Sequence, residues 1–389
     1  MQNFWEKSNW QNADKHLLAL QNNPFQRPFP ALPEGPGLFV IRGPRQIGKS
    51  SWLKTLLLLS VPEESFYVSC EGFSDHKDLT EFLKTIPERN NLFLDEISFV
   101  DQWWRSIKSL LDQRDDIRIV VTGSHAYDLK KGMDQMPGRW GGGGEFELLP
   151  MDFMEFSAMR RQANWPSLSR EEELELYFKI GGFPMSLAES GPKGKKPVKS
   201  FEIYRRWLLG DLMKMGKQEA YLREIISQLA LTMGSTVSLQ KIAQRTQVGS
   251  HNTAQDYIEL LETCFALKTL YEYDLETSVP KFRKEKKFYF RDPLIYWIAL
   301  EWGEVVPPKN TFDVLAEMVA HEHLVRRFKK FGFTTGKKGE IDFISPKNWA
   351  IEVKWKDTPT GLSQAYRDLV IQDKVVWTKQ NFLKNFPGK

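Results

Sequence analysis

One stretch of the chain reads Gly43-Pro44-Arg45-Gln46-Ile47-Gly48-Lys49-Ser50 and fills every fixed position of the pattern G-x-x-x-x-G-K-[ST]. The apolar run 38–41 before it predicts a buried strand, and residues 51–59 after it have the composition of a helix. Strand, glycine loop and helix in this order direct backbone N–H groups and the positive end of the helix at a phosphate. We therefore expect a nucleotide site around these eight residues and Ser51, in which Lys49 reaches the β- and γ-phosphates and Ser50 binds Mg²⁺. A chance glycine-rich turn is the alternative.

Two carboxylates, Asp95 and Glu96, end the apolar run 92–94. Ligands of open α/β sheets bind where the strands end, so both carboxylates are expected near the glycine loop. Asp95 can hold the water shell of Mg²⁺, and Glu96 can orient and deprotonate an attacking water. A third apolar run, 117–121, leads into Thr122-Gly123-Ser124, where Ser124 is a candidate for contacting the γ-phosphate and a plain turn is nearly as good an interpretation.

Composition places the chain among soluble multidomain proteins. Its 389 residues are too many for one core, and its 41% hydrophobic and 27% charged content is ordinary. No apolar stretch approaches the roughly 20 residues of a membrane helix, and the N-terminus lacks the pattern of a signal peptide. The two cysteines, Cys70 and Cys264, fit a reducing compartment and exclude a cysteine-rich zinc site. We expect a cytoplasmic protein without a membrane partner.

The net charge of +4 is unevenly distributed along the chain. Residues 311–389 contain 14 Lys and Arg against 9 Asp and Glu, an excess of five positive charges. This excess favours a polyanionic partner such as DNA for the C-terminal part, although surpluses of this size are also common on soluble surfaces.

The first 150 residues alternate short apolar runs with helical patterns, as a parallel α/β sheet does. The expected strands are 38–42, 66–70, 92–95, 117–122 and 145–149. Arg139, just before a run of four glycines, is a candidate arginine finger for the phosphates, and a surface arginine on a mobile loop is the alternative. A helical region follows, and residues 190–197 have the composition of a linker.

Residues 201–300 have the pattern of a winged helix-turn-helix. Ser238 and Ser250 are expected to cap two helices, with wing strands at 265–270 and 287–290. A basic run lies in or near this wing: Lys281, Arg283, Lys284, Lys286 and Lys287. Groove binding to DNA is one interpretation, and packing against protein is the other. The second helix has no Lys or Arg before Thr263, which weakens base readout.

The last motif is a pair of alternating strands, 340–344 and 350–354. If Ile344 pairs with Ala350, Asp342 lies opposite Glu352 with Cβ atoms about 5 Å apart, close enough to share a divalent cation. Lys354 points to the same face as Glu352, and Glu317 on a preceding helix can complete the set. Such a set can support metal-assisted phosphodiester hydrolysis, and a charged solvent face is the alternative. The neighbouring His321-Glu322-His323 is expected to be a solvated helix face rather than a metal cluster.

Taken in order, these elements resemble a large prokaryotic family of AAA-superfamily ATPases with a C-terminal restriction-endonuclease-like domain of the PD-(D/E)XK type. The resemblance also uses four further motifs: Gly138-Arg139, Pro150-Met151-Asp152-Phe153-Met154-Glu155-Phe156, Gly181-Gly182-Phe183-Pro184 and Lys287-Phe288-Tyr289-Phe290-Arg291-Asp292. The four glycines after Arg139 depart from the family pattern.

The resemblance implies an α/β multidomain protein: an ATPase domain at 1–150, a helical lid at 151–192, a winged helix at 200–302 and a nuclease-like domain at 311–389. It assigns nucleotide roles to Lys49, Ser50, Asp95 and Glu96, and a nuclease-like site to Glu317, Asp342, Glu352 and Lys354. The expected activity is Mg²⁺-dependent ATP hydrolysis that switches the winged-helix and nuclease-like half, and a homo-oligomer is among the expected partners. The rivals are an ATP-gated DNA nuclease in DNA processing or defence, and a non-catalytic regulator or scaffold.

Overall fold

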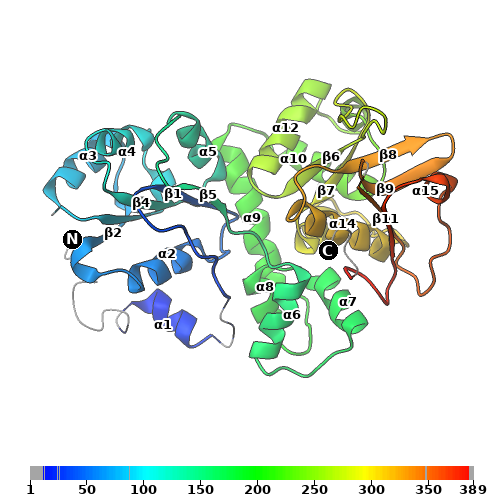
Figure 1. Cartoon of the computed structure of the whole chain (residues 1–389), viewed down its shortest axis with the longest axis horizontal. Coiled ribbons are helices and arrows are strands. Elements are labelled where there is room, and N and C mark those ends of the chain that lie inside the picture. Colours follow the sequence, from blue (N-terminus) through cyan, green and yellow to red (C-terminus); the bar gives the residue numbers. More distant parts are fainter. Residues whose placement is uncertain are drawn as a thin grey trace. The chain divides into compact units, whose positions relative to one another are not determined.

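The computed structural model describes residue 12 and residues 14–23, 25, 27–86, 88–346 and 348–384. The chain divides into two compact units (Figure 1). The first comprises Met1–Leu149, Ala158–Trp165 and Thr263–Phe265, and the second comprises the remainder. Helix α6 (Phe153–Gln162) is therefore divided between the two units. The separate lid, winged-helix and nuclease-like ranges of the sequence analysis all fall mainly within the second unit and stay predictions.

The first unit is built on a five-stranded parallel sheet. Its strands are β1 (Gly37–Arg42), β2 (Ser65–Ser69), β3 (Asn91–Asp95), β4 (Arg118–Thr122) and β5 (Gly144–Glu147). They lie in the order β2-β3-β4-β1-β5. All six residues of β1 are buried, because this strand is covered on both faces and lies between two neighbours. All five strands were predicted from apolar runs, whereas their spatial order was not.

Helices cover both faces of this sheet: α1 (Lys15–Gln21), α2 (Lys49–Leu58), α3 (His76–Thr85), α4 (Trp104–Leu111) and α5 (Ala126–Asp134). Figure 1 shows α1 and α2 on one face and α3, α4 and α5 on the other. The connection from β1 through α2 runs to the far edge strand β2, and the chain then returns strand by strand. This reversal places the end of β1 beside the end of β4, with the end of β3 one strand further on.

The second unit begins with helices α7 (Arg170–Ile180), α8 (Pro184–Ser190) and α9 (Val198–Lys214). The break between α7 and α8 is fixed by a buried carboxylate, because Asp292 accepts the Gly182 N–H at 2.7 Å. A Cβ on Gly182 would lie 2.0 Å from the carbonyl oxygen of Met151, so this position needs glycine. The Gly181-Gly182 and Arg291-Asp292 motifs thus meet in one structural contact.

Helix α10 (Glu219–Thr232) follows, and after it come two helices and two antiparallel strands in the order that the sequence predicted: α11 (Leu239–Gln244), α12 (His251–Thr263), β6 (Leu267–Tyr271) and β7 (Lys286–Phe290). Both expected caps are confirmed. The Ser238 hydroxyl accepts the Lys241 N–H and the Ser250 hydroxyl accepts the Thr253 N–H, each at 3.1 Å. Helix α13 (Pro293–Trp302) then packs against α7, α9 and α10.

The chain ends in a four-stranded mixed sheet of order β11-β10-β9-β8. Its elements are α14 (Thr311–Val325), β8 (Gly332–Gly336), β9 (Gly339–Ser345), β10 (Trp349–Val353), α15 (Gln364–Asp368) and β11 (Asp373–Trp377). Strands β8, β9 and β10 are antiparallel, and β11 runs parallel to β10. The predicted pairing of Ile344 with Ala350 is confirmed. No helix in the described ranges is both long and apolar enough to span a membrane.

Candidate nucleotide site and C-terminal carboxylate cluster

The glycine loop lies at the carboxyl end of β1 and leads into α2. Gly43 has φ +154°, and a Cβ there would lie 2.0 Å from the Leu148 carbonyl oxygen. Glycine is therefore required at the first fixed position of the motif. Gly48 immediately precedes the helix in the left-handed region, with φ +106°. The loop thus has the strand-to-helix geometry that the sequence predicted.

Lys49 is buried and its ammonium lies against the loop itself. Its Nζ donates to the carbonyl oxygens of Gly43 at 3.0 Å and Pro44 at 2.7 Å. Carbonyl oxygens hold the lysine within the concavity of the loop, where an anion is the better partner for its charge. The Ser51 hydroxyl is instead hydrogen-bonded to the His16 ring at 2.8 Å. Only the backbone of Ser51 is therefore left for the predicted contact with phosphate.

Asp95 is the centre of a hydroxyl cluster. The Ser50 hydroxyl donates to its Oδ1 at 3.0 Å, and the Tyr67 hydroxyl donates to its Oδ2 at 3.0 Å. Thr122, at the end of β4, donates to the same carboxylate. Burial, followed by the Asp95 charge, raises the pKa of Tyr67, which therefore stays a hydrogen-bond donor. The structure brings Ser50 and Asp95 together as predicted, whereas the sequence analysis missed Tyr67 because it lies on another strand.

Glu96 directly follows β3 in the left-handed region, with φ 54°. Its Oε2 accepts the Ser124 N–H at 2.8 Å, and its own N–H donates to Thr122 Oγ1 at 3.2 Å. Left-handed backbone is uncommon for a residue with a Cβ and clusters at functional sites. The two strand-end motifs, Asp95-Glu96 and Thr122-Gly123-Ser124, are thereby joined into one site beside the glycine loop.

Two residues that the sequence analysis did not single out extend this site. His125 is buried, and its Nε2 is hydrogen-bonded to the Arg45 guanidinium of the loop. Its Nδ1 lies 3.4 Å from the Ser98 hydroxyl. The position of His125 directly after Ser124 was the available signal, but a lone histidine in a sequence does not reveal its partner.

Arg139 does not reach the glycine loop of its own chain. Its guanidinium pairs with Asp112 at 2.8 Å, beyond the C-terminal end of α4. The neighbouring Gly141 bridges to Gly37, the first residue of β1, whereas the loop follows the last residue of that strand. Arg139 therefore lies near the amino ends of the strands, away from the glycine loop of its own chain. A role in the site of a second copy stays a prediction.

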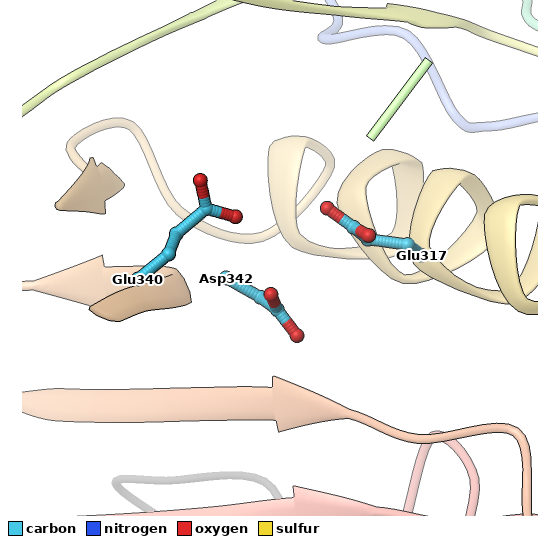
Figure 2. A group of neighbouring side chains, drawn as sticks. All are labelled: Glu317, Glu340 and Asp342. Atoms are coloured by element: carbon cyan, nitrogen blue, oxygen red, sulfur yellow. The ribbon is translucent and has the colours of Figure 1, made fainter. Parts of the chain in front are cut away.

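A group of three carboxylates lies in the second unit. Oxygen atoms of Glu317, Glu340 and Asp342 lie within 4.8 Å of one another. Figure 2 shows Glu317 extending from α14 toward Glu340 and Asp342 on β9. The sequence analysis predicted Glu317 and Asp342 but not Glu340. The signal was available, since Glu340 and Asp342 are two residues apart and share one face of the strand.

Glu352 and Lys354 form a neighbouring pair rather than completing that group. The Lys354 ammonium lies 2.8 Å from Glu352 Oε2 and 3.5 Å from Asp342 Oδ2. Asp342 Oδ2 also accepts the Val353 N–H at 2.8 Å. Burial and then the Asp342 charge raise the pKa of Glu352 to about 7, against the lowering by Lys354. Asp342 and Glu352 therefore lie close together as expected. Their closeness raises the free energy of ionising both carboxyl groups at once.

The expectation of a solvated His321-Glu322-His323 face is wrong, because all three side chains are buried. Glu322 pairs with Arg291 at 3.1 Å and Arg326 at 2.9 Å. Burial lowers the pKa of both histidines to about 3, so they are neutral near pH 7. Helix α14 packs against β7, β10 and α7. The sequence of the helix alone does not indicate this packing.

Two residues of the basic run of the wing are paired with carboxylates. Lys281 pairs with Glu272 at 3.0 Å, and Lys287 is fully buried. The exposed residues of α12 include Asp256 and Glu259, and the helix contains no Lys or Arg. Arg283 and Lys284 of the basic run are exposed, so groove binding by the wing stays a prediction, whereas α12 itself offers no cation to a phosphate.

Comparison with known proteins assigns part of the chain to a family. Residues 36–157 match the family described as AAA domain, and residues 171–304 match a domain of unknown function, DUF8612. Residues 36–157 are therefore similar to an AAA-type P-loop domain, which implies nucleotide binding at the glycine loop.

Relatives with wider coverage are distant. An uncharacterized protein of Methanocaldococcus jannaschii is 25% identical over 335 residues, which cover 78% of this chain and 71% of the relative. The Walker-type ATPase of Pyrococcus abyssi is similar with TM-score 0.45 and 16% identity, over 72% of this chain and 92% of that structure. The Aeropyrum pernix ORC1 protein in complex with DNA gives TM-score 0.32 and 12% identity, over 69% and 87%.

Proposed function

We propose that this chain is a Mg²⁺-dependent ATPase whose catalytic centre combines the glycine loop with Asp95, Glu96 and Ser124. The supporting observation is the hydrogen bond of 3.0 Å between the Ser50 hydroxyl and Asp95. It joins the loop that binds phosphates to the strand end that supplies carboxylates. The match of residues 36–157 to the AAA domain family supports the same assignment.

The donor set fits Mg²⁺, which prefers oxygen ligands. Ser50 would hold the ion through its hydroxyl and Asp95 through its carboxylate, directly or by a water. When bound, Mg²⁺ neutralises charge on the β- and γ-phosphates. Lys49 exchanges the Gly43 and Pro44 carbonyls for phosphate oxygens, and the backbone of the loop surrounds the phosphates.

Glu96 is the general base in this proposal. Its carboxylate stays hydrogen-bonded to the Ser124 N–H until a γ-phosphate and a water are present, and it then takes a proton from that water. Ser124 is the neighbour placed to respond to the γ-phosphate. Arg45 of the loop is hydrogen-bonded to His125, which directly follows Ser124. Phosphate binding to the loop therefore also affects the segment whose Ser124 N–H holds Glu96.

ATP binding and phosphate release by three variants test this proposal. Lys49→Ala removes the charge on the phosphates and should bind ATP at least about tenfold more weakly. Glu96→Gln should retain ATP binding and lose roughly 10²-fold or more in turnover. Glu63→Gln, an exposed carboxylate outside the site, is the matched control and should behave as the parent. Equal turnover by Glu96→Gln and the parent would remove Glu96 from the mechanism.

The coupling of nucleotide state to the second unit is part of the proposal. It is supported by α6, whose first residues belong to the second unit and whose last residues belong to the first. The proposal is that a rearrangement of the first unit is passed on along this helix. An arginine finger from Arg139 requires a second copy of the chain, so sedimentation with and without ATP tests the homo-oligomer.

DNA remains a candidate partner through the positive excess of residues 311–389 and the basic run at 281–287. Binding of this kind should fall steeply with salt and show little sequence preference. Binding that is absent at low salt would favour a protein partner. The cytoplasmic location stays a prediction that cell fractionation tests.

A further inference from the structure

The carboxylates Glu317, Glu340 and Asp342 have the spacing of a divalent cation site, but another cation already lies among them. The Lys287 ammonium is 2.9 Å from Glu317 Oε1 and 2.5 Å from Glu340 Oε1. The Lys287 side chain has no exposed surface, and its Nζ lies 5.6 Å from the centre of the Phe333 ring. The three carboxylates come from α14 and β9, and the lysine comes from β7.

The surroundings hold this ammonium in its charged form. Burial alone lowers the pKa of a lysine, but Glu317, Asp342 and Glu340 together outweigh it and raise the pKa of Lys287. The Tyr289 hydroxyl donates to the same Glu317 oxygen at 2.5 Å. Strand β7 is itself fixed by its pairing with β6 and by a bridge from Lys286 to Val237. Lys287 is therefore not a mobile surface side chain that can leave the cluster without displacing its strand.

We propose that Lys287 is the resident cation of this cluster and that it excludes divalent metal ions, so the nuclease-like site is closed in this fold. A metal ion that bound all three carboxylates would leave the buried ammonium beside a second positive charge and without its partners. An unpaired buried charge is strongly destabilising. The nuclease interpretation of the motif assumed a site open to Mg²⁺, and the residues present do not fit that assumption. Opening would require β7 to withdraw.

Lysine is suited to this role because it supplies one compact positive charge with three donors. The adjacent Lys286 offers an internal comparison. Successive residues of a strand point to opposite faces. Lys286 accordingly lies over the Tyr271 ring at 5.8 Å and donates to the Lys284 carbonyl, away from the carboxylates. The two lysines thus differ in environment while sharing residue type, strand and neighbours in sequence.

Mn²⁺ binding to the full-length, nucleotide-free protein tests the proposal. Calorimetry should find the same Mn²⁺ stoichiometry for the parent and for Asp342→Asn, because the cluster holds no metal to lose. Lys287→Met should gain one Mn²⁺ site per chain, and the additional change Asp342→Asn should abolish it. The matched control Lys286→Met should gain none. Circular dichroism establishes that each variant is folded.

Two results would overturn the proposal. One is loss of a Mn²⁺ site on making Asp342→Asn in the parent background, which would show a metal site open beside Lys287. The other is a folded Lys287→Met that gains no site. If Lys287→Met does not fold, the comparison of the parent with Asp342→Asn still decides. ATP hydrolysis enters none of these measurements, so failure here leaves the proposed ATPase function standing.

Discussion

Asp292 shows how one buried residue can make the stability of the fold depend on pH. Its carboxylate accepts the N–H groups of Gly182 at 2.7 Å and Leu294 at 2.8 Å. Burial raises its pKa to about 7, although these hydrogen bonds lower it. A carboxyl with a raised pKa in the folded state contributes most to stability below its unfolded pKa of 3.8. That contribution is lost as the pH rises toward 7.

We therefore expect Asp292→Asn to compare more favourably with the parent at pH 8 than at pH 4. The amide carries no charge, so it avoids the cost of ionising a buried group, while the loss of one acceptor lowers stability at both pH values. Thermal melts across this range measure the difference in Tm. Asp115→Asn, an exposed aspartate, provides the control and should show no such trend. A difference in Tm that is independent of pH would contradict the raised pKa.

Among single residues, the sequence predicted those whose roles follow from a local pattern. It missed those whose roles depend on a partner far away in the sequence. Lys49, Ser50, Asp95 and Glu96 were found because fixed spacing and strand ends locate them. Lys287 was predicted to belong to a basic run in or near the wing, and the structure buries it against Glu317. Its partner is 30 residues away on another element, and neither composition nor periodicity describes that contact. Tyr67 and His125 were missed for the same reason, whereas Glu340 could have been found from its spacing to Asp342 on β9.

Among the elements, the loop between β1 and α2 depends most directly on one backbone position. Gly43→Ala would place a methyl group 2.0 Å from the Leu148 carbonyl oxygen, at a φ of +154°. Strain of this kind costs roughly 1–3 kcal/mol. We expect the loop to move and ATP binding to weaken by at least about tenfold, measured by titration with a fluorescent ATP analogue.

Gly72→Ala is the control for that change, because a Cβ there meets nothing within 4 Å and its φ is ordinary. It should bind ATP as the parent does. Parental binding by Gly43→Ala would mean that the loop adapts, and that the glycine is not needed for its geometry.

Element types were predicted more fully than element packing. Continuous apolar runs predicted all five strands of the parallel sheet, and alternation predicted the β9–β10 register, because both patterns are visible within a short window. His321-Glu322-His323 of helix α14 was predicted to face solvent because the residues are polar, but other elements enclose the helix. Polar residues that are buried in pairs, such as Glu322 with Arg291, look like surface residues in a sequence.

For the molecule as a whole, the question is whether nucleotide binding in the first unit alters the second unit, since α6 has residues in both. A ligand stabilises the state that binds it, by about 2.7 kcal/mol at a hundredfold excess over Kd. That stabilisation must include the residues around the phosphates. The mixed sheet gains protection only if binding in the first unit alters the second.

Hydrogen exchange with and without Mg²⁺ and ATP measures this directly. We expect slower exchange in the loop 43–51 and in 95–96 and 122–125, because these backbone groups become ordered around phosphate. If α6 transmits the change, slower exchange should extend through 153–162 into α7. Lys49→Ala should abolish both effects, and Glu96→Gln, which keeps ATP bound, should enhance them. Protection that stops within the first unit in Glu96→Gln would refute the coupling and leave the second unit independent of nucleotide.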